Sequence, residues 1–345
     1  MQYKKHIITF SKLGDFIIQN LDTDALKPLF SATRNENGWF TEDNVKLAVE
    51  NIAKIYLNET ALEKFTQKYA FLNENFNPKK IGIVMAGNIP AVGFHDLLCV
   101  VLSGNIALLK LSSSDTASMT FLINKLYEFD PELKNTIIIA QRLNDADALI
   151  ATGSDNTAKH FEYYFSSKPR IIRRNRTSVA VLNGNESRAE LANLGNDIFQ
   201  YFGLGCRNVS KFYVPIGYTF DKFYESIEYW STIQLHHKYN NNYDYNKSIY
   251  LVNRIPHLDN GFLLLKETGG RPDDSLVSPI SVCFYETYEN DAHLEQLLAE
   301  SAEKIQCTVS SDTRFLNSFK FGEAQVPKLE DFADGIDTME FLINL

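Results

Sequence analysis

From residue 81 onward, short apolar runs alternate with longer mixed segments, and this alternation restricts the fold more than any other feature of the chain. The expected strands are 81–85, 106–111, 136–140, 148–151 and 179–182, and the expected helices between them are 92–102 and 117–129. Strands that alternate with helices at this spacing pair in parallel and are covered on both faces. The sequence therefore predicts an α/β fold with open, mostly parallel sheets.

A second alternating region begins near residue 190. Its expected elements are a helix over 189–201 and strands over 209–215, 248–252, 262–265 and 280–284. Residues 1–80 are expected to be mainly helical, and the acidic, turn-rich tail from residue 321 is typical of an arm that lies on another surface. We place a boundary between two domains at about residues 182–190.

The net charge of -9 argues against nonspecific nucleic-acid binding and gives no reason to expect attraction to an anionic membrane. The first ten residues do not resemble a signal peptide, and no apolar run approaches the roughly 20 residues that span a bilayer. We therefore expect a cytoplasmic protein without membrane insertion.

The cysteines are widely separated and form no CxxC pair, which indicates neither a disulfide framework nor a zinc site; they are Cys99, Cys206, Cys283 and Cys307. Cys206 stands in FGLGCRN, between a predicted helix and a predicted strand. The flanking glycines permit a sharp turn, and the adjacent Arg207 favours a thiolate, the form that attacks. The alternative is a small buried apolar residue, which most unpaired cysteines are.

Other candidates lie where predicted strands end. Asn88 in AGNIPAVGFHD either offers an amide donor to a developing oxyanion or simply forms a turn. Lys110 precedes Ser112 and Ser113 at an expected helix start. A lysine, hydroxyls and helix amides can hold phosphate there. The alternative is a surface lysine followed by a serine that caps the helix. Gly153 and Ser154 open a further helix, either beneath a pyrophosphate or as a plain chain reversal.

Two more features have both a functional and a structural interpretation. The basic run RIIRRNR at 170–176 either contacts phosphates or forms a solvated face. The adjacent His236 and His237 point in different directions in a helix or a strand, so at most one of them is expected to act as an acid or base. No GxGxxG fingerprint of dinucleotide-binding proteins occurs in the chain.

Taken together and in this order, the motifs resemble the aldehyde dehydrogenase superfamily, and more closely its acyl-CoA reductase branch, which includes LuxC-like fatty acid reductases. The resemblance covers roughly residues 80–345. It rests on GNIPAVGFHDLL, SGNIALLKLSS, ATGS, RRNRTSVAVL, FGLGCRN and DFADGIDTMEFL. Each of these is weak alone, and their combination is specific.

The resemblance implies a role for each matched residue. It makes Cys206 the nucleophile and Asn88 the side-chain donor to the oxyanion. It makes Lys110 a ligand of the adenine ribose and places Gly153 and Ser154 near the pyrophosphate and nicotinamide. The family often has a glutamate where this chain has Ser113, a change that removes repulsion of a 2′-phosphate. We therefore expect NADPH, with NADH as the alternative.

Two departures from the family pattern bear on the chemistry. The general-base glutamate of aldehyde oxidisers falls near Ile172, and no acidic residue lies between Glu162 and Glu186. Ser275 stands where the family has the glutamate that holds the nicotinamide ribose. An enzyme that reduces its acyl intermediate, or passes it to a thiol, has no need of a base that activates water.

The resemblance implies an aldehyde dehydrogenase-like fold with a cofactor-binding domain over residues 1–185, a catalytic domain over 186–315 and a C-terminal arm over 316–345. It implies an acyl-CoA or acyl-carrier thioester as substrate, an acyl-cysteine intermediate, a fatty aldehyde product and a homodimer. The alternatives are an oxidative aldehyde dehydrogenase and a non-catalytic relative that binds acyl chains or nucleotides.

Overall fold

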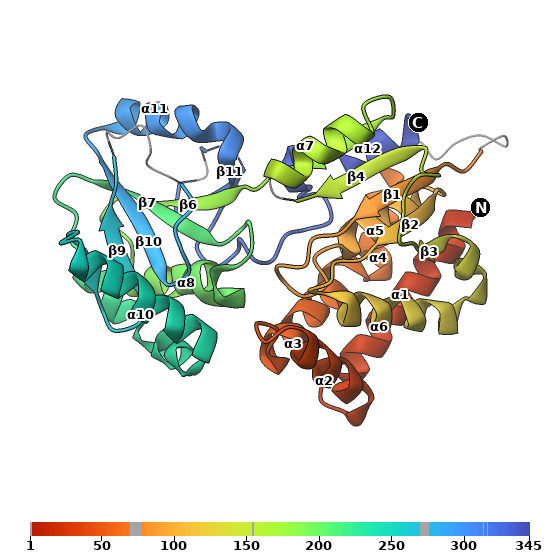
Figure 1. Ribbon diagram of the computed structural model, residues 1–345, viewed down its shortest axis with the longest axis horizontal. Helices are drawn as coiled ribbons and strands as arrows, with labels where there is room; N and C mark the ends of the chain where they lie inside the picture. The colour runs from red at the N-terminus through yellow and green to blue at the C-terminus, as the bar shows by residue number, and fades with distance from the viewer. Residues whose placement is uncertain (1, 70–76, 154, 270–275, 313, 316) are drawn as a thin grey trace. The chain divides into compact units, whose positions relative to one another are not determined.

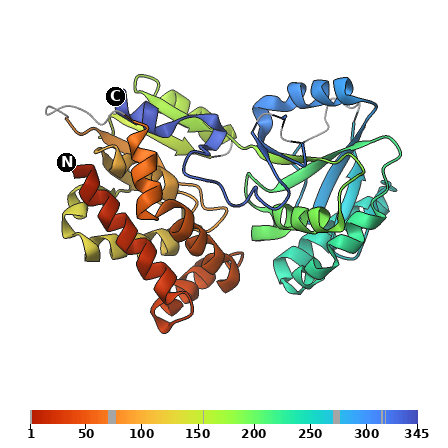
Figure 2. The ribbon, with the colours of Figure 1, turned by 180° about the vertical axis from the view of Figure 1, so that it is seen from behind.

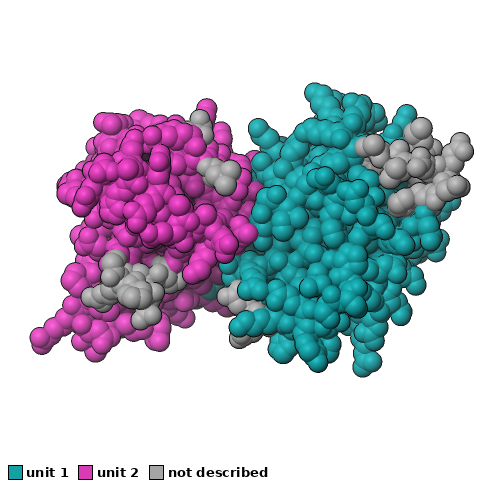
Figure 3. Space-filling model, turned by 90° about the horizontal axis from the view of Figure 1, so that it is seen from above, with its two compact units in different colours: residues 1–175, 327–345 teal, residues 176–326 magenta. Residues whose placement is uncertain are grey.

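The computed structural model describes residues 2–69, 77–153, 155–269, 276–312, 314–315 and 317–345. The chain divides into two compact units, coloured separately in Figure 3. Unit 1 comprises Met1–Asn175 and Pro327–Leu345, and unit 2 comprises Arg176–Val326. No helix in the described part of the chain is long and apolar enough to span a membrane.

Unit 1 is built around a parallel sheet with the strand order β3-β2-β1-β4-β5. Its strands are β1 (Lys80–Val84), β2 (Ile106–Lys110), β3 (Ile137–Ile139), β4 (Ala148–Thr152) and β5 (Arg170–Arg173). Its longer helices are α1 (Gln2–Asn20), α2 (Lys27–Glu36), α3 (Glu42–Asn51), α4 (Glu59–Gln67), α5 (Phe94–Leu102), α6 (Thr116–Phe129) and α7 (Asp155–Tyr164), with α12 (Thr338–Ile343) at the C-terminus.

Both faces of the sheet are buried at its central strands β1, β2 and β4, because alternate residues of these strands pack into different cores. Ile81 and Ile83 of β1 join the large core formed with α1 to α6. Leu108 and Leu149 belong to a smaller core on the other face, where Phe161 of α7 packs. Strands buried on both faces explain why the sequence shows continuous apolar runs here.

The C-terminal residues return to unit 1, where helix α12 packs on α5 (Figure 2). A buried ion pair connects this region: Arg173 of β5 donates to Asp96 of α5 at 2.6 Å and to Thr338 of α12 at 2.9 Å. Because a charge left without its partner in the interior is costly, this network fixes the end of β5 against both helices.

Unit 2 contains a second sheet with the order β12-β11-β6-β7-β10-β9-β8, parallel except for the β8–β9 pair. The strands are β6 (Thr177–Val181), β7 (Val209–Pro215), β8 (Leu258–Asp259), β9 (Leu264–Glu267), β10 (Val282–Tyr288), β11 (Ile305–Ser310) and β12 (Ser318–Phe319). The helices are α8 (Arg188–Phe199), α9 (Asp221–Ser226), α10 (His237–Val252) and α11 (Asp291–Ser301). Helix α11 lies on one face of the sheet, with α8 and α10 on the other (Figure 1).

These elements match most of the sequence-based expectations, and the mainly helical N-terminal region is confirmed. The expected strand over 248–252 is wrong, since this run is the last part of helix α10. Tyr239, Tyr243, Asn246 and Tyr250 are buried at helical spacing, so a period of 3.6 residues outweighs the β-branched composition of the run. The proposed domain limits at residues 185 and 315 are functional assignments and stay predictions.

Candidate active site

Cys206 lies in a turn of unit 2 that connects the short 3₁₀ helix η4 (Gln200–Gly203) to strand β7. Helix α8 leads into this turn and begins with a capping box, in which Ser187 and Glu190 bond each other's backbone amides. The backbone then takes left-handed φ values of 53° at Tyr201, 58° at Phe202 and 77° at Gly203. These three consecutive residues reverse the chain and bring Cys206 to the start of β7.

Asn208 fixes this turn from within. Its side-chain Oδ1 accepts from the amide of Gly205 at 2.8 Å. Its Nδ2 donates to the carbonyl oxygens of Asp197 at 3.0 Å and Gln200 at 2.9 Å. Because Asn208 is 2% exposed, these bonds do not compete with water. One buried amide therefore connects the end of α8 to the residue before Cys206.

Burial distinguishes Cys206 from the other cysteines. Cys206 is partly exposed, whereas Cys99, Cys283 and Cys307 are buried. Burial raises the pKa of Cys99 and of Cys283 well above the ordinary value, and it raises the pKa of Cys307 to about 11. These three thiols are therefore protonated near neutral pH and poor nucleophiles.

Ser178 of β6 connects Cys206 to the sheet. The Ser178 hydroxyl donates to the Cys206 carbonyl oxygen at 3.1 Å and lies 3.0 Å from the Cys307 sulfur. Arg207 places its guanidinium 4.9 Å from the centre of the Phe319 ring and lowers the pKa of Cys307 against the effect of burial. The arginine that follows Cys206 is thus directed toward Phe319 of β12.

The two candidate histidines have different surroundings. The His236 ring stacks on Phe202 of the turn that leads to Cys206, with the ring centroids 4.2 Å apart. Its Nδ1 accepts from the Tyr239 amide at 3.4 Å, so the proton of the neutral ring is on Nε2. His237 is exposed on the first turn of α10. Of the pair, His236 is the one that contacts the segment before Cys206.

In unit 1, the remaining candidates follow the carboxyl ends of neighbouring parallel strands. Asn88 follows β1, Lys110 ends β2 with Ser112 and Ser113 after it, and Gly153 follows β4. Strands β2 and β3 are added on one side of β1, and β4 and β5 on the other. Ligands of open α/β sheets bind where the direction of strand addition changes in this way. Asn88, Lys110 and Ser113 are exposed there, while Ser154 and Ser275 lie outside the described residues.

The loops that carry Asn88 and Ser112 touch at Gly87. A Cβ atom on Gly87 would lie 2.3 Å from Ser112 Oγ and 2.6 Å from Ser112 Cβ, so only glycine allows this approach. We expect Gly87→Ala to displace Asn88 and to lower the rate of enzyme acylation by roughly 100-fold. Gly217→Ala is the control for backbone strain away from the site: its φ of 82° strains an alanine, but a Cβ there meets nothing within 4 Å. Acylation at the wild-type rate in Gly87→Ala would contradict the expectation.

The N-terminus of α6 is already occupied by an anionic side chain of the protein. Glu36, the last residue of α2, accepts from the amides of Thr116 at 2.9 Å and Ala117 at 2.6 Å. The first amides of α6 are therefore bonded by Glu36, which takes the place of the predicted serine cap. The phosphate contacts predicted for Lys110, Ser112 and Ser113 stay predictions.

The basic run 170–176 has structural partners. Arg170 donates to the last carbonyl groups around α7, including Phe165 and Ser166. Arg173 is buried against Asp96, and Arg174 pairs with Glu162 at 2.8 Å. Arg176 belongs to unit 2 and donates to the Ile305 carbonyl oxygen at 3.4 Å. The structure therefore supports the structural interpretation of this run.

Two buried carboxyl groups next to the candidate loops have shifted protonation. Asp115 follows Ser114 and is 1% exposed; Asp197 lies in α8 and accepts from the amides of Gly322 at 2.6 Å and Ala324 at 3.0 Å. Burial raises the pKa of each from 3.8 to about 7. Neither residue was identified from the sequence, where they are two of many scattered acidic residues.

These shifts predict how stability depends on pH. A carboxyl group whose pKa is higher in the folded chain favours folding fully below its unfolded value of 3.8, and this contribution is lost as the pH rises through 7. Asp115→Asn removes the titration, so we expect its stability relative to wild type to increase by roughly 2–3 kcal/mol between pH 5 and pH 8. Urea unfolding at both pH values measures this. If the difference in the free energy of unfolding between Asp115→Asn and wild type is the same at both pH values, the pKa of Asp115 is not raised.

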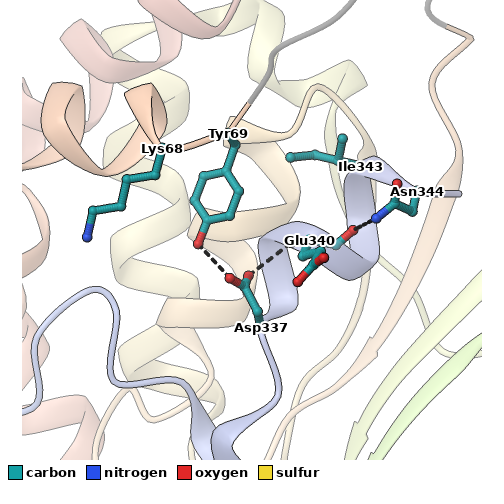
Figure 4. A pocket seen from close by; sticks show the side chains of 6 residues that line it. All are labelled: Lys68, Tyr69, Asp337, Glu340, Ile343 and Asn344. Atoms are coloured by element: carbon teal, nitrogen blue, oxygen red, sulfur yellow. Dashed lines mark hydrogen bonds between the residues drawn. The ribbon is translucent and has the colours of Figure 1, made fainter.

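One cavity in the described chain is lined by none of the candidate site residues (Figure 4). It has a volume of about 430 Å³ and is lined by Lys68, Tyr69, Asp337, Glu340, Ile343 and Asn344. Tyr69 donates to Asp337 at 2.9 Å across it. Since neither Asn88 nor Lys110 lines this cavity, it is not the cofactor site that the sequence predicts.

Comparisons with solved structures define the class of fold. Aldehyde dehydrogenase 21 from Physcomitrella patens superimposes with a TM-score of 0.70 at 11% identity, covering 100% of this chain and 84% of the other. An NAD-dependent aldehyde dehydrogenase from Sinorhizobium meliloti gives a TM-score of 0.66 at 12% identity, covering 91% and 71%. An NADP-dependent enzyme from E. coli gives 0.67 at 11%, covering 90% and 73%. The predicted aldehyde dehydrogenase-like fold is confirmed.

The family follows from the sequence comparisons. Residues 18–216 match the model of the family described as acyl-CoA reductase (LuxC), and the chain belongs to this family. A curated relative, long-chain acyl-protein thioester reductase 2 from Photobacterium leiognathi, is 26% identical over 160 residues. That match covers 42% of this chain and only 33% of the relative's length. The resemblance stated from the motifs is confirmed at the level of the family.

Proposed function

We propose that the protein reduces a fatty acyl thioester to an aldehyde through an acyl intermediate on Cys206, with NADPH as the reductant. The observation that carries the proposal is the setting of Cys206, a partly exposed thiol in a turn fixed by Asn208, in a member of the acyl-CoA reductase family. The names of the family and of the relative point to coenzyme A or a protein thiol as the acyl donor.

The first half of the reaction exchanges one thioester for another. The Cys206 thiolate attacks the thioester carbonyl carbon, and Asn88 is proposed to donate to the resulting oxyanion together with the Cys206 amide. The tetrahedral intermediate collapses by breaking the bond to the donor sulfur, which leaves as a thiolate and takes up a proton. The acyl group is then bound to Cys206.

The second half reduces this acyl group. Reduced nicotinamide, when bound, supplies a hydride equivalent to the carbonyl carbon. Cys206 holds the resulting thiohemiacetal and leaves from it as the thiolate, so that the aldehyde is released and the nucleophile is regenerated. The hydride brings both electrons and the new hydrogen of the aldehyde. The proton consumed besides it is the one that the leaving thiol takes up.

The residues of unit 1 fit such a cofactor at the carboxyl edge of the sheet. Lys110 and Ser113 are exposed at the end of β2, and Gly153 follows β4, on the two sides of β1. We propose that Lys110 binds the adenine ribose and that Ser112 and Ser113 bind a 2′-phosphate. A hydroxyl at Ser113 in place of a carboxylate favours NADPH over NADH, because it removes repulsion from the phosphate.

Ile172 supports reduction over oxidation. It lies in the strand β5, and by the motif resemblance the base that activates water in aldehyde oxidisers falls near this residue. Without that base, hydrolysis of the acyl-cysteine is slow, and the intermediate persists until it is reduced or returned to a thiol.

The test follows the absorbance of the reduced cofactor with purified protein and a long-chain acyl-CoA, and then with an acylated carrier protein. We expect oxidation of NADPH that requires the thioester and yields aldehyde, with slower turnover of NADH. Conversion of free aldehyde and NAD to acid, without thioester, would instead establish an oxidative dehydrogenase. Thioester binding without turnover in either direction would establish a non-catalytic binding protein.

A further inference from the structure

The loop between β1 and α5 contains a backbone conformation that needs support. Ala91 has a φ of 54° and is 2% exposed. A non-glycine residue adopts this left-handed conformation at a cost in free energy, and it persists where the surroundings hold it. Ala91 lies three residues after Asn88, and its carbonyl oxygen accepts from the Phe94 amide at the start of α5. The conformation of Ala91 therefore sets the direction in which the Asn88 segment joins the helix.

Asp115 supplies that support. Its Oδ2 accepts from the Ala91 amide at 2.8 Å, across a separation of 24 residues. Asp115 is 1% exposed, so water cannot replace this bond. Its other oxygen lies beside the Ser118 hydroxyl, but neither atom makes a hydrogen bond of normal geometry. Among the described residues, the Ala91 amide is thus the donor that makes a hydrogen bond of normal geometry to the Asp115 carboxyl group.

The side chain of Asp115 is not needed to cap the helix that follows it. Asp115 is the residue before α6, but it makes no side-chain capping bond. Glu36 performs that function by accepting from the amides of Thr116 and Ala117. An aspartate just before a helix ordinarily caps that helix, but here Glu36 is the capping residue.

The same turn also holds the other end of the Asn88 segment. Ser112 crowds Gly87, and the Ser112 carbonyl oxygen accepts from the Asp115 amide at 3.1 Å and from the Thr116 hydroxyl at 2.9 Å. The compact turn 112–116 therefore touches residue 87 before Asn88 and residue 91 after it. Asn88 is the exposed residue between the two contacts.

We propose that Asp115 is a positioning residue for Asn88: by holding the amide of Ala91, it fixes the loop that presents the Asn88 amide to the thioester oxygen. This rests on the proposed role of Asn88 in the reaction. Asp115 itself touches neither substrate nor cofactor in this account. Its effect reaches the chemistry through the backbone of residues 88–91.

The experiment compares Asp115→Ala with Asp115→Asn and with Glu36→Ala. Asparagine keeps an oxygen acceptor for the Ala91 amide, and alanine does not. Glu36→Ala removes the cap of α6 and leaves the Asp115–Ala91 bond intact. Two quantities are measured: amide hydrogen exchange in a peptide spanning residues 86–93, and the rate at which the thioester releases its thiol in a single turnover without cofactor.

We expect Asp115→Ala to accelerate exchange at Ala91 by about tenfold or more and to slow acylation by roughly 10- to 100-fold, with little change in thioester affinity. Asp115→Asn should behave like wild type in both measurements. Glu36→Ala should expose the first amides of α6 and leave Ala91 and the acylation rate unchanged. If Asp115→Ala does not fold, Asp115→Ser, whose side chain is too short to reach Ala91, takes its place.

Unchanged exchange at Ala91 and unchanged acylation in Asp115→Ala would overturn the proposal. Equal defects in Asp115→Asn and Asp115→Ala would also overturn it, because the asparagine keeps the acceptor. Hydrogen exchange requires no activity, so it decides whether Asp115 holds the loop even if the wild-type protein forms no acyl-enzyme. A wild-type protein that forms no acyl-enzyme would contradict the proposed function, and it would leave open to the exchange measurement whether Asp115 holds the loop.

Discussion

Cys206→Ala should lower thioester-dependent NADPH oxidation by about three orders of magnitude or more, to the background of the assay. Alanine has no atom that can carry the acyl group. No buried thiol is placed to substitute: Cys307, which is connected to Cys206 through Ser178, has its pKa raised to about 11 by burial. The measurement is the initial rate of cofactor oxidation with a saturating acyl-CoA, after circular dichroism has shown that the variant is folded.

Cys283→Ala is the matched control in the same unit. Cys283 is buried in β10, and its removal should lower the free energy of unfolding by about 1 kcal/mol without changing the rate. Substantial activity in Cys206→Ala, or an equal loss in both variants, would show that Cys206 is not the nucleophile.

Asn208→Ala should lower both stability and activity. The substitution leaves the Gly205 amide and the carbonyl oxygens of Asp197 and Gln200 without their buried partner. Lost and unsatisfied buried hydrogen bonds of this number cost about 2–4 kcal/mol in the free energy of unfolding. Because the bonds hold the residue before Cys206, we also expect acylation to slow by roughly 100-fold. Urea unfolding and single-turnover thiol release measure the two effects.

Asn246→Ala separates the effect on the site from the effect on stability. Asn246 is a buried asparagine of α10 that donates to the carbonyl oxygens of Asn242 and Ile280. Its replacement should destabilise unit 2 but leave acylation close to the wild-type rate. If both asparagine variants acylate equally, Asn208 contributes only to stability.

The sequence predicts the central strands well because they are buried on both faces. The expected strands beginning at residues 81, 106 and 148 correspond to β1, β2 and β4, whose apolar runs are continuous. Strand β5 was not predicted, because its sequence RIIR carries charges at both ends. One of these charges, Arg173, is buried only through its pairing with Asp96, a contact between residues 77 positions apart that no local pattern reveals.

The sequence identifies the proposed reacting groups of the candidate site more readily than the residues that hold them. Cys206 and Asn88 stand in recognisable motifs next to turn-forming glycines or prolines. Asn208 is also adjacent to its motif, but its importance depends on carbonyl groups at the end of α8 that the fold brings to it. Asp115 and Ala91 are 24 residues apart, and nothing in either segment predicts their bond.

Local propensity was misleading at the start of α6. The run SSSD before Thr116 predicts a serine or aspartate cap, with amides available to a phosphate. Glu36 instead reaches these amides from α2, about 80 residues earlier in the chain. A capping carboxylate from a distant helix satisfies the same donors, so the local motif was correct about the helix and wrong about its cap.

The most direct test of the acyl-enzyme is intact-protein mass spectrometry after incubation with a long-chain acyl thioester in the absence of cofactor. We expect one acyl group per chain, located on Cys206. It should persist in water because residue 172 is an isoleucine, and it should be discharged as aldehyde when NADPH is added. An acyl group on another residue, no adduct at all, or spontaneous discharge as free acid would contradict this expectation.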